Sequence, residues 1–278
     1  MKKVLAFDIG GTNMRAALIN ENFEIEKIVI EDTKKDTVDV FLDHVVALAE
    51  KIGISNDIVA ISCGVPGKVR WDGFIYELPN IGIKNIPLGE YLNQKFGITT
   101  YVINDAEMAG LGEATLGIGK DYETVFFVTI STGVGGALVR NKVGLVPDDE
   151  IGHTLVDYKG NYYEFEKLYS GTGIVKLAEL NDLKINKAYE LFKLKEEGNE
   201  KAILVYNEWL NGISWLLKFI NTSFETDVIV FSGGVLKSSD FFWDDLIKKC
   251  EGINIEIAAN QQFAGLMGSA YHGFHPQS

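Results

Sequence analysis

VLAFDIGGTN, residues 4–13, sets an apolar strand directly before a glycine turn, and the second half of the chain repeats the arrangement as VFFVTISTGVGGAL, residues 125–138. In both stretches an apolar strand enters the turn and a second apolar strand leaves it. A glycine turn lets backbone N–H groups approach an anion closely, because no Cβ stands in the way. Two such turns, one in each half, predict a duplicated fold that holds a polyphosphate between its halves. Nucleotide-driven phosphoryl transfer is therefore the first functional hypothesis.

Strands and helices alternate around the two turns. Strands are expected at 3–9, 14–20, 24–30, 58–63, 99–103, 124–130, 136–140, 227–231 and 253–258. Helices are expected from Asp36 or Thr37 to about Lys51, at 88–96, 106–116, 240–250 and 264–274, with two or three more across 173–222. A polar, Tyr-rich loop is expected at 148–168. This order indicates an α/β fold with a mainly parallel central sheet in each half.

Length and composition narrow the class of protein. The 278 residues are 46% hydrophobic, enough for a large core and more than one domain usually needs. A formal net charge of −13 argues against nucleic acid or an anionic membrane as the main partner. The two cysteines, Cys63 and Cys250, support neither a disulfide framework nor a Cys-rich zinc site. Without a signal-peptide pattern or an apolar run of about 20 residues, a cytoplasmic protein is expected.

Asp8 ends an apolar strand just before Gly10, Gly11 and Thr12. A carboxylate at such a buried position is costly unless it has a partner, and a divalent cation bridging phosphates would be one. Thr12 and the glycine N–H groups could meet phosphate oxygens. The alternative is an ordinary tight hairpin with a solvated Asp. The second turn, with Thr132 and Gly133, can likewise be either a phosphate-binding turn or an ordinary hairpin.

Asn104 and Asp105 stand where a predicted strand ends and a helix begins. Ligands of open α/β sheets bind at such ends, and a carboxylate there can accept the proton of an attacking hydroxyl. The alternative is a plain helix cap, since Asn and Asp are among the best capping residues. The pattern alone favours neither.

Glu150, His153 and Glu166 place two carboxylates and an imidazole in and after one loop. Such groups can bind sugar hydroxyls, each of which both donates and accepts hydrogen bonds. A lone structural histidine is the alternative for His153, and a metal site that also includes Asp157 is a weaker one. Gly233 and Gly234 follow a strand and could place backbone against an adenine or ribose, or form only a strand-to-helix turn.

Taken together, these residues resemble the ROK family over essentially the whole chain. The resemblance rests on eight motifs in order: Asp8-Ile9-Gly10-Gly11-Thr12, Gly64-Val65-Pro66-Gly67, Pro79-Asn80, Asn104-Asp105, Thr132-Gly133-Val134-Gly135-Gly136, Glu150-Ile151-Gly152-His153, Ser170-Gly171-Thr172-Gly173 and Ser232-Gly233-Gly234. ROK proteins are sugar kinases and sugar-responsive repressors of the actin-like ATPase superfamily. The resemblance implies a duplicated ribonuclease-H-like fold of two α/β domains with an active-site cleft between them. It divides the chain into 1–105, joined by the helix at about 264–278, and 106–263.

The resemblance also implies a role for each site residue. The expected catalytic base is Asp105, which would accept the proton of a sugar hydroxyl. The expected sugar-binding residues are Gly64, Asn80, Asn104, Asp105, Glu150, His153 and Glu166. The expected ATP-binding residues are Asp8, Gly10, Gly11, Thr12, Thr132, Gly133, Gly233 and Gly234, with Asp8 near Mg²⁺, directly or through water.

One segment departs from the family pattern. Many relatives carry a Cys-rich zinc motif after the Glu-x-Gly-His loop, but here residues 157–165 contain no cysteine. No zinc site is therefore expected, and hydrogen bonds and packing from the Tyr-rich loop must hold His153 instead. A smaller departure is Asn13, where many relatives have lysine.

The resulting expectation is an ATP- and Mg²⁺-dependent hexose kinase acting on the 6-hydroxyl, with glucose as the first choice of sugar. N-acetylmannosamine, N-acetylglucosamine, fructose and allose remain open. A sugar-responsive repressor is disfavoured because the first motif begins within ten residues of the start, leaving no room for a DNA-binding module. A sugar-binding protein without catalysis is disfavoured by the presence of Asp105 and both glycine turns. The resemblance suggests a homodimer.

Overall fold

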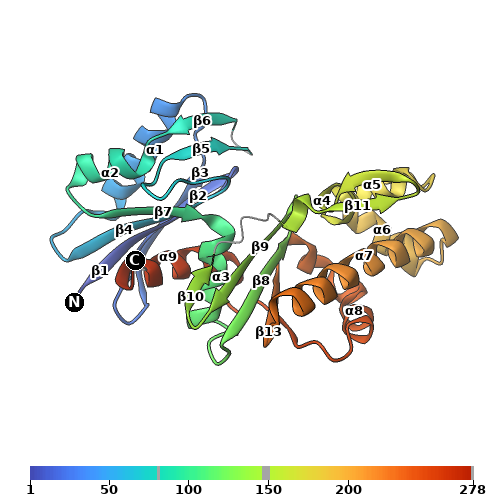
Figure 1. Ribbon diagram of the computed structural model, residues 1–278. Helices are drawn as coiled ribbons and strands as arrows, with labels where there is room; N and C mark the ends of the chain where they lie inside the picture. Colours follow the sequence, from blue (N-terminus) through green and yellow to red (C-terminus); the bar gives the residue numbers. More distant parts are fainter. Residues whose placement is uncertain (80–81, 146–150, 277–278) are drawn as a thin grey trace. The chain divides into compact units, whose positions relative to one another are not determined.

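The computed structural model describes residues 1–79, 82–145 and 151–276, which form two compact units (Figure 1). The first unit comprises Met1–Lys120, Lys142–Gly144 and Ala259–Ser278, and the second comprises Asp121–Asn141 and Leu145–Ala258. Within the described residues no helix is long and apolar enough to cross a membrane.

The first unit is built on a five-stranded sheet of order β3-β2-β1-β4-β7. Its elements are β1 (Lys3–Ile9), β2 (Asn13–Asn20), β3 (Ile25–Asp32), α1 (Val38–Ile52), β4 (Ile58–Val65), β5 (Ile75–Leu78), β6 (Ile83–Ile86), α2 (Leu88–Phe96), β7 (Thr100–Asn104), α3 (Asp105–Leu116) and α9 (Ala264–Phe274). β2 pairs antiparallel with β1 and β3, whereas β4 and β7 run parallel to β1. The sheet is therefore mixed rather than mainly parallel, because tight turns join only antiparallel neighbours.

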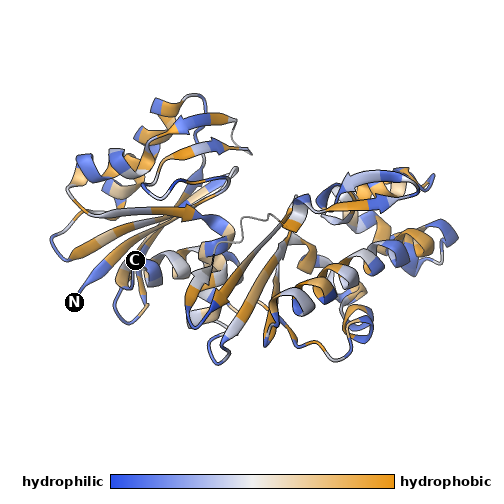
Figure 2. Ribbon diagram, viewed as in Figure 1, coloured by the Kyte–Doolittle hydropathy of each residue, from blue (hydrophilic) through white to orange (hydrophobic). Residues whose placement is uncertain are grey.

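Alternation along β1 divides the core of this unit between the two faces of the sheet. Leu5, Phe7 and Ile9 pack in the cluster that includes α1 and α2, whereas Val4 and Ala6 pack with α9. Successive side chains of a strand point to opposite faces, so a strand buried on both sides is apolar throughout. Figure 2 shows this apolar colouring along the sheet strands.

The predicted first helix is confirmed, and its ends have local causes. The Thr37 hydroxyl accepts a hydrogen bond from the Val40 N–H at 3.2 Å, which satisfies one of the free donors of the first turn. At the other end the Gly53 N–H donates to the Ala49 carbonyl at 3.0 Å with φ of 102°. Glycine tolerates that conformation better than other residues.

α3 and α9 cross at glycines, which lets their backbones touch. A Cβ at Gly268 would lie 1.6 Å from the carbonyl oxygen of Met108, and one at Gly112 would lie 2.3 Å from that of Ala264. This contact groups α3 with the first unit, whereas the division expected from the sequence falls at residue 105, before the body of α3.

The second unit repeats the sheet, in the order β10-β9-β8-β13-β14. Its elements are β8 (Thr124–Ile130), β9 (Val134–Arg140), η1 (Ile151–His153), β11 (Leu155–Tyr158), β12 (Asn161–Glu164), α4 (Glu166–Tyr169), α5 (Gly173–Glu179), α6 (Ala188–Glu196), α7 (Glu200–Phe224), β13 (Val228–Ser232), η2 (Gly234–Phe241), α8 (Trp243–Lys249) and β14 (Ile255–Ile257). Two short elements remain: β10 (Val143–Leu145) at the edge of this sheet and η3 (Gln261–Phe263) before α9. β8 pairs antiparallel with β9 and parallel with β13, as β1 does with β2 and β4.

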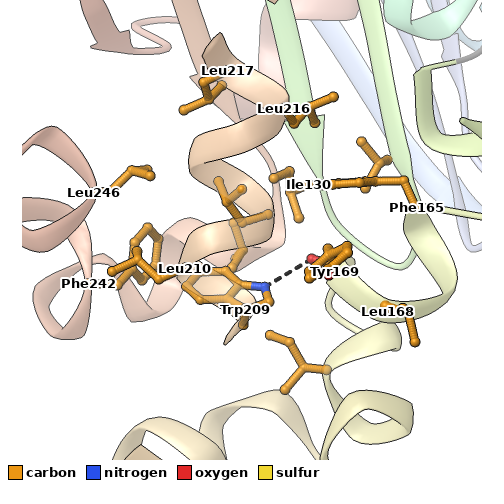
Figure 3. Close-up of a cluster of buried hydrophobic side chains, with 14 of the residues drawn as sticks. Ile130, Phe165, Leu168, Tyr169, Trp209, Leu210, Leu216, Leu217, Phe242 and Leu246 are labelled. Carbon is orange, nitrogen blue, oxygen red and sulfur yellow. Dashed lines mark hydrogen bonds between the residues drawn. The ribbon is translucent and has the colours of Figure 1, made fainter. Parts of the chain in front are cut away.

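The core of the second unit centres on α7 and its tryptophan. Trp209 is fully buried, and its indole N–H donates to the carbonyl of Tyr169 at 3.0 Å (Figure 3). The rings of Phe192 and Phe242 meet Trp209 edge to face, at centroid distances of 5.3 and 5.1 Å. Such pairs stabilise a core beyond the area they bury.

Two expectations about local structure were wrong, and one hairpin was not expected. The expected loop at 148–168 contains the hairpin β11–β12 and the short helix α4, within the residues that the structure describes. The helix expected at 240–250 is two elements, η2 and α8, with a break at Phe242. The hairpin β5–β6 was not expected, because its two strands are only four residues long.

Candidate functional site

Three glycine-containing segments of the second unit meet at Ser131, the residue that follows β8. Its carbonyl accepts a hydrogen bond from the Gly171 N–H at 2.7 Å, and its hydroxyl accepts one from the Gly234 N–H at 2.7 Å. Its own N–H donates to the Gly133 carbonyl at 2.9 Å. The structure thus brings together the second glycine turn, the Ser-Gly-Thr-Gly segment and the Ser-Gly-Gly segment, which lie far apart in sequence.

A cavity of about 520 Å³ lies beside this meeting point. Hydroxyl groups, glycine backbone, two lysines and an aromatic ring line it: Ser131, Thr132, Thr172, Gly234, Lys187, Lys237 and Tyr189. Its size is that of a small-molecule site. Ammonium and hydroxyl donors suit phosphate oxygens, and an exposed ring suits the face of a base.

Gly233 makes the close contact at this cavity possible. Its φ is 105°, and a Cβ there would lie 2.3 Å from the carbonyl oxygen of Ile130. Both the conformation and the space exclude a side chain. The turn after β13 can therefore lie directly against the end of β8.

Glu166 reaches from the start of α4 to the second glycine turn. Its Oε2 accepts a hydrogen bond from the Val134 N–H at 3.3 Å and would lie 2.6 Å from a Cβ at Gly133. A predicted sugar-binding side chain and a predicted phosphate-binding turn are therefore in contact, within one unit. That contact matches what a phosphoryl transfer to a sugar requires, since acceptor and phosphate must meet.

His153, Glu164 and Glu166 form a cluster whose ligand atoms all lie within 4.8 Å of one another. Lys167 offsets part of the negative charge, with its Nζ 2.7 Å from Glu166 Oε1 and 3.6 Å from Glu164 Oε2. An imidazole with two carboxylates can hold a divalent cation. The sequence argument included His153 and Glu166 but missed Glu164. The expectation of no zinc site stays a prediction.

The first glycine turn is held from the side by the segment that follows β3. The Thr33 hydroxyl donates to the Gly10 carbonyl at 2.6 Å, and the Thr33 N–H donates to the Thr12 carbonyl at 2.8 Å. The Lys35 ammonium donates to the Gly11 carbonyl at 3.0 Å. Because the carbonyls bond to this segment, they do not compete with an anion for the same face of the turn.

Asp8 forms a half-buried ion pair with Arg15 directly across the β1–β2 hairpin. Arg15 Nη1 donates to Asp8 Oδ2 at 2.6 Å, and the two side chains are 24% and 17% exposed. Burial raises the pKa of the Asp8 carboxyl, and the guanidinium of Arg15 opposes that rise. Asp8 is thus a carboxylate that a positive charge must stabilise.

Asp8, Gly64 and the pair Asn104-Asp105 lie at one edge of the first sheet. Asp8 is the register partner of Gly64 on β4, and the end of β4 pairs with Asn104 on β7. A Cβ at Gly64 would lie 3.6 Å from the Cα of Asp105, so this glycine leaves room for the start of α3. The carboxyl ends of adjacent parallel strands are the usual ligand-binding edge of such sheets (Figure 1).

Asn104 is both a helix cap and a link to another predicted motif. Its Oδ1 accepts hydrogen bonds from the N–H groups of Ala106 at 2.9 Å and Glu107 at 3.4 Å. Its Nδ2 donates to the carbonyl of Gly67 at 3.1 Å. The capping and binding interpretations therefore coexist, because the cap fixes the neighbouring Asp105 at the helix start.

Glu107 is a second carboxyl in the first turn of α3. Burial, with a contribution from the negative charge of Asp105, raises the pKa of Glu107 to about 7. A carboxyl that titrates near neutral pH beside a predicted base is typical of functional sites.

The described residues thus form two sets, one in each unit. Asp8, Gly10, Gly11, Thr12, Gly64, Asn104 and Asp105 belong to the first unit, and Thr132, Gly133, His153, Glu166, Gly233 and Gly234 to the second. Asn80 and Glu150 lie outside the described residues. The sequence argument missed Arg15, Ser131, Lys187, Tyr189 and Lys237. Only Arg15 carried a usable signal, since a short hairpin places it opposite Asp8.

Comparison with known proteins supports one family. The sequence model of the ROK family matches residues 4–272. A glucokinase of Halalkalibacterium halodurans is 26% identical over 95% of this chain and 92% of its own length. An N-acetyl-D-glucosamine kinase of Haemophilus influenzae is 30% identical over 87% of this chain and 86% of its own length.

The fold agrees with that match. The crystal structure of a ROK family glucokinase from Streptomyces griseus, in complex with glucose and AMPPNP, superposes with a TM-score of 0.75. It is 22% identical and covers 97% of this chain and 98% of its own. The expected duplicated, actin-like ATPase fold is therefore confirmed. Because the family model matches residues 4–272 and the fold agrees, the chain belongs to the ROK family.

Proposed function

We propose that the protein is an ATP-dependent sugar kinase that phosphorylates a hexose at its 6-hydroxyl, with glucose as the first candidate. The observation that carries this proposal is the meeting of two predicted nucleotide-binding segments, at Thr132-Gly133 and Gly233-Gly234, with the Ser-Gly-Thr-Gly segment at Ser131, next to Glu166. Relatives named as glucokinase and N-acetyl-D-glucosamine kinase support the reaction class. The sugar itself stays a proposal, and N-acetylmannosamine, N-acetylglucosamine and fructose are the alternatives.

The residues of the second unit fit a nucleotide. The 520 Å³ cavity combines hydroxyl and ammonium donors with an aromatic ring, and Gly233 is a position that no Cβ fits. In this proposal Thr132, Gly133 and Gly234 hold the phosphates, and Tyr189 packs against the base. AMPPNP in the Streptomyces griseus structure is consistent with ATP as donor.

The residues of the first unit fit a magnesium ion and a proton acceptor. Asp8 offers the hard oxygen that Mg²⁺ prefers, directly or through water. Bound Mg²⁺ and ATP supply charge neutralisation and the phosphoryl group. Asp105, fixed by the Asn104 cap, would take the proton of the 6-hydroxyl as that oxygen bonds to the γ-phosphorus of ATP and ADP leaves. The proposed sugar-binding residues are Gly64 and Asn104 in the first unit and His153 and Glu166 in the second.

An ADP-release assay across a panel of sugars tests the proposal. The panel is glucose, N-acetylmannosamine, N-acetylglucosamine, fructose and allose, and Asp105→Asn is the control variant. The variant keeps the acceptor oxygen for the Ala106 N–H, so it should fold and bind sugar. We expect its kcat to fall by several orders of magnitude. Silence with every sugar would overturn the proposed function, and normal turnover by the variant would overturn the role of Asp105. The homodimer and the cytoplasmic location remain predictions.

A further inference from the structure

The connection between β3 and α1 fastens the first glycine turn by its carbonyl oxygens. Residues 33–35, here called the strap, donate hydrogen bonds to the carbonyls of Gly10, Gly11 and Thr12. Thr33 supplies the bonds to Gly10 and Thr12, and it is only 8% exposed. Every contact described below lies inside the first unit.

Holding the carbonyls of Gly10 and Gly11 also sets the direction of the N–H groups that follow them. A trans peptide is planar, and its C=O and the following N–H point to opposite sides. Because these carbonyls face the strap, the N–H groups of Gly11 and Thr12 face away from it. Successive backbone N–H groups that point the same way can bind an anion. In the proposed function they are donors for a phosphate of ATP.

The imidazole of His44, a buried residue of α1, holds the strap. His44 is 3% exposed, and its Nδ1 lies 3.3 Å from the backbone nitrogen of Lys34. Its Nε2 lies 3.2 Å from Glu31 Oε2. Because a backbone N–H can only donate, Nδ1 is the acceptor, and the ring proton is on Nε2, from which the carboxylate accepts it. The same carboxylate also bonds to the ammonium of Lys51.

The bond to His44 is made in the middle of the strap. Lys34 stands between Thr33 and Lys35, the two residues that bond to the glycine turn. The connection is short, since residues 33–37 alone join β3 to α1. Removing the Nδ1 acceptor leaves the Lys34 N–H without its partner, so the strap must shift or open to water to satisfy that donor.

We propose that His44 is a positioning residue for phosphate binding, which acts through Lys34 and the strap on the first glycine turn. The inference rests on the proposed function, in which that turn binds a phosphate of ATP. The role belongs to one ring atom, Nδ1, because Nε2 bonds to Glu31 and not to the strap. A role in packing, by contrast, would belong to the whole ring.

The first measurement uses the unchanged protein. The ¹⁵N chemical shifts of an imidazole distinguish a protonated ring nitrogen from an unprotonated one. At pH 8 we expect His44 to carry its proton on Nε2 and not on Nδ1. A proton on Nδ1 would overturn the proposal, since that atom could not then accept a hydrogen bond from Lys34.

Two amide substitutions separate the two ring nitrogens. In His44→Asn the side-chain carbonyl takes the position of Nδ1 and can accept from Lys34. In His44→Gln the amide reaches the position of Nε2, so it can bond to Glu31 but leaves Lys34 without its acceptor. Tyr91→Phe is the matched control, because it removes a 3.1 Å hydrogen bond to Asp43, the neighbour of His44 on α1. Near-ultraviolet circular dichroism and thermal unfolding establish that each variant is folded.

Hydrogen exchange of the Thr33 N–H, measured by NMR without any ligand, tests the strap itself. This N–H donates to the Thr12 carbonyl at 2.8 Å. We expect its exchange to be about 3- to 10-fold faster in His44→Gln, the size of one lost hydrogen bond, and parent-like in His44→Asn and Tyr91→Phe. Parent-like exchange in His44→Gln would overturn the proposal. Equal acceleration in both His44 variants would show a role in packing and would overturn it too.

Binding of AMPPNP with Mg²⁺, measured by calorimetry, tests the link from the strap to phosphate. We expect the Kd for AMPPNP to rise about 3- to 10-fold in His44→Gln and to stay within about twofold of the parent in His44→Asn. Thr33→Val removes the hydroxyl bond to the Gly10 carbonyl and should have an effect of similar size. Because His44 and Thr33 act on one strap, the double variant should lose less affinity than the two single effects combined. Fully additive losses would contradict the proposal.

The measurements keep the two proposals apart. A parent that binds no AMPPNP would overturn the proposed function, whereas the exchange of the Thr33 N–H would still decide the role of His44. If His44→Gln does not fold, the tautomer of the parent and the AMPPNP affinity of Thr33→Val decide. Parent-like affinity in Thr33→Val would then overturn the inference.

Discussion

The two glycine turns belong to copies of one sheet, but only the first has a charged pair at the matched positions of the two strands that flank it. The strand orders β3-β2-β1-β4-β7 and β10-β9-β8-β13-β14 correspond position by position. In β1 the residue before the last is Asp8, and Arg15 faces it across the hairpin. At the same place in β8 stands Thr129, which faces Gly135. One copy therefore has an ion pair where the other has a hydroxyl and a glycine.

The comparison separates a feature that both copies of the sheet share from a feature that only one copy has. Both copies offer a backbone turn that an anion can approach. A half-buried carboxylate, by contrast, needs a positive charge, and only the first copy provides one in Arg15. Among the matched strand positions, Asp8 is thus the one carboxylate that can meet a cation bridging phosphates, whereas the carboxylate at the second turn, Glu166, comes from α4 and not from the sheet.

Within this comparison, the largest expected effect comes from replacing the residue at the matched strand position in each copy. Asp8→Asn should lower kcat about 100- to 1000-fold, the usual effect of removing one group that stabilises transferring charge. Thr129→Val at the matching position should stay within about threefold of the parent, because no charge is lost. ADP release at saturating sugar and nucleotide measures both.

The pair of variants also provides its own control. Both side chains lie at the same strand position, so a general disturbance of the sheet would affect both. Comparable losses in the two variants would show that the asymmetry of charge has no catalytic meaning. Thermal unfolding of each variant separates lost activity from lost structure.

The sequence predicted those features that depend on neighbouring residues, but not those that depend on contacts between distant parts of the chain. α2 and α9 occur at the residues expected, because the glycines and the apolar spacing that mark them lie within the helices or beside them. The meeting at Ser131 could not be predicted, since its hydroxyl bonds to Gly234 across 103 positions of sequence. Lys187 and Tyr189 reach the cavity by tertiary packing that no short pattern encodes.

A second comparison concerns two glycines with positive φ, one in each unit. At Gly233 a Cβ would meet the Ile130 backbone, whereas at Gly53 nothing lies within 4 Å. Gly233→Ala should therefore cost about 2 to 4 kcal/mol of unfolding free energy. Gly53→Ala should cost only about 1 kcal/mol from backbone strain. Urea unfolding measures both, and equal costs would show that close approach at Gly233 is not required.

A further expected effect is a pH dependence of stability that arises from Glu107 in the first unit. Glu107 has a pKa of about 7 in the folded state, above its ordinary value near 4.5. The folded state therefore binds this proton more tightly than the unfolded state. Unfolding free energy should fall by about 2 to 3 kcal/mol as pH rises from about 4.5 to about 7.

Glu107→Gln should remove that dependence and be more stable than the parent at pH 8. Urea unfolding at pH 5 and pH 8 compares the two proteins. Glu107 is the third residue after β7, and the third residue after β14 is Asn260, so the matching position in the second sheet should add no such slope. A parent whose stability does not change over this interval would contradict the assignment.

The glycine crossing of α3 and α9 has a consequence for the order in which the chain folds during synthesis. α9 covers the face of β1 that carries Val4 and Ala6, but it follows α3 by almost 150 residues of sequence. At ordinary translation rates that interval lasts roughly 10 to 30 seconds. Synthesis of the first unit begins before that of the second unit and ends after it. A ribosome-bound intermediate must therefore keep the apolar face of β1 shielded until α9 emerges.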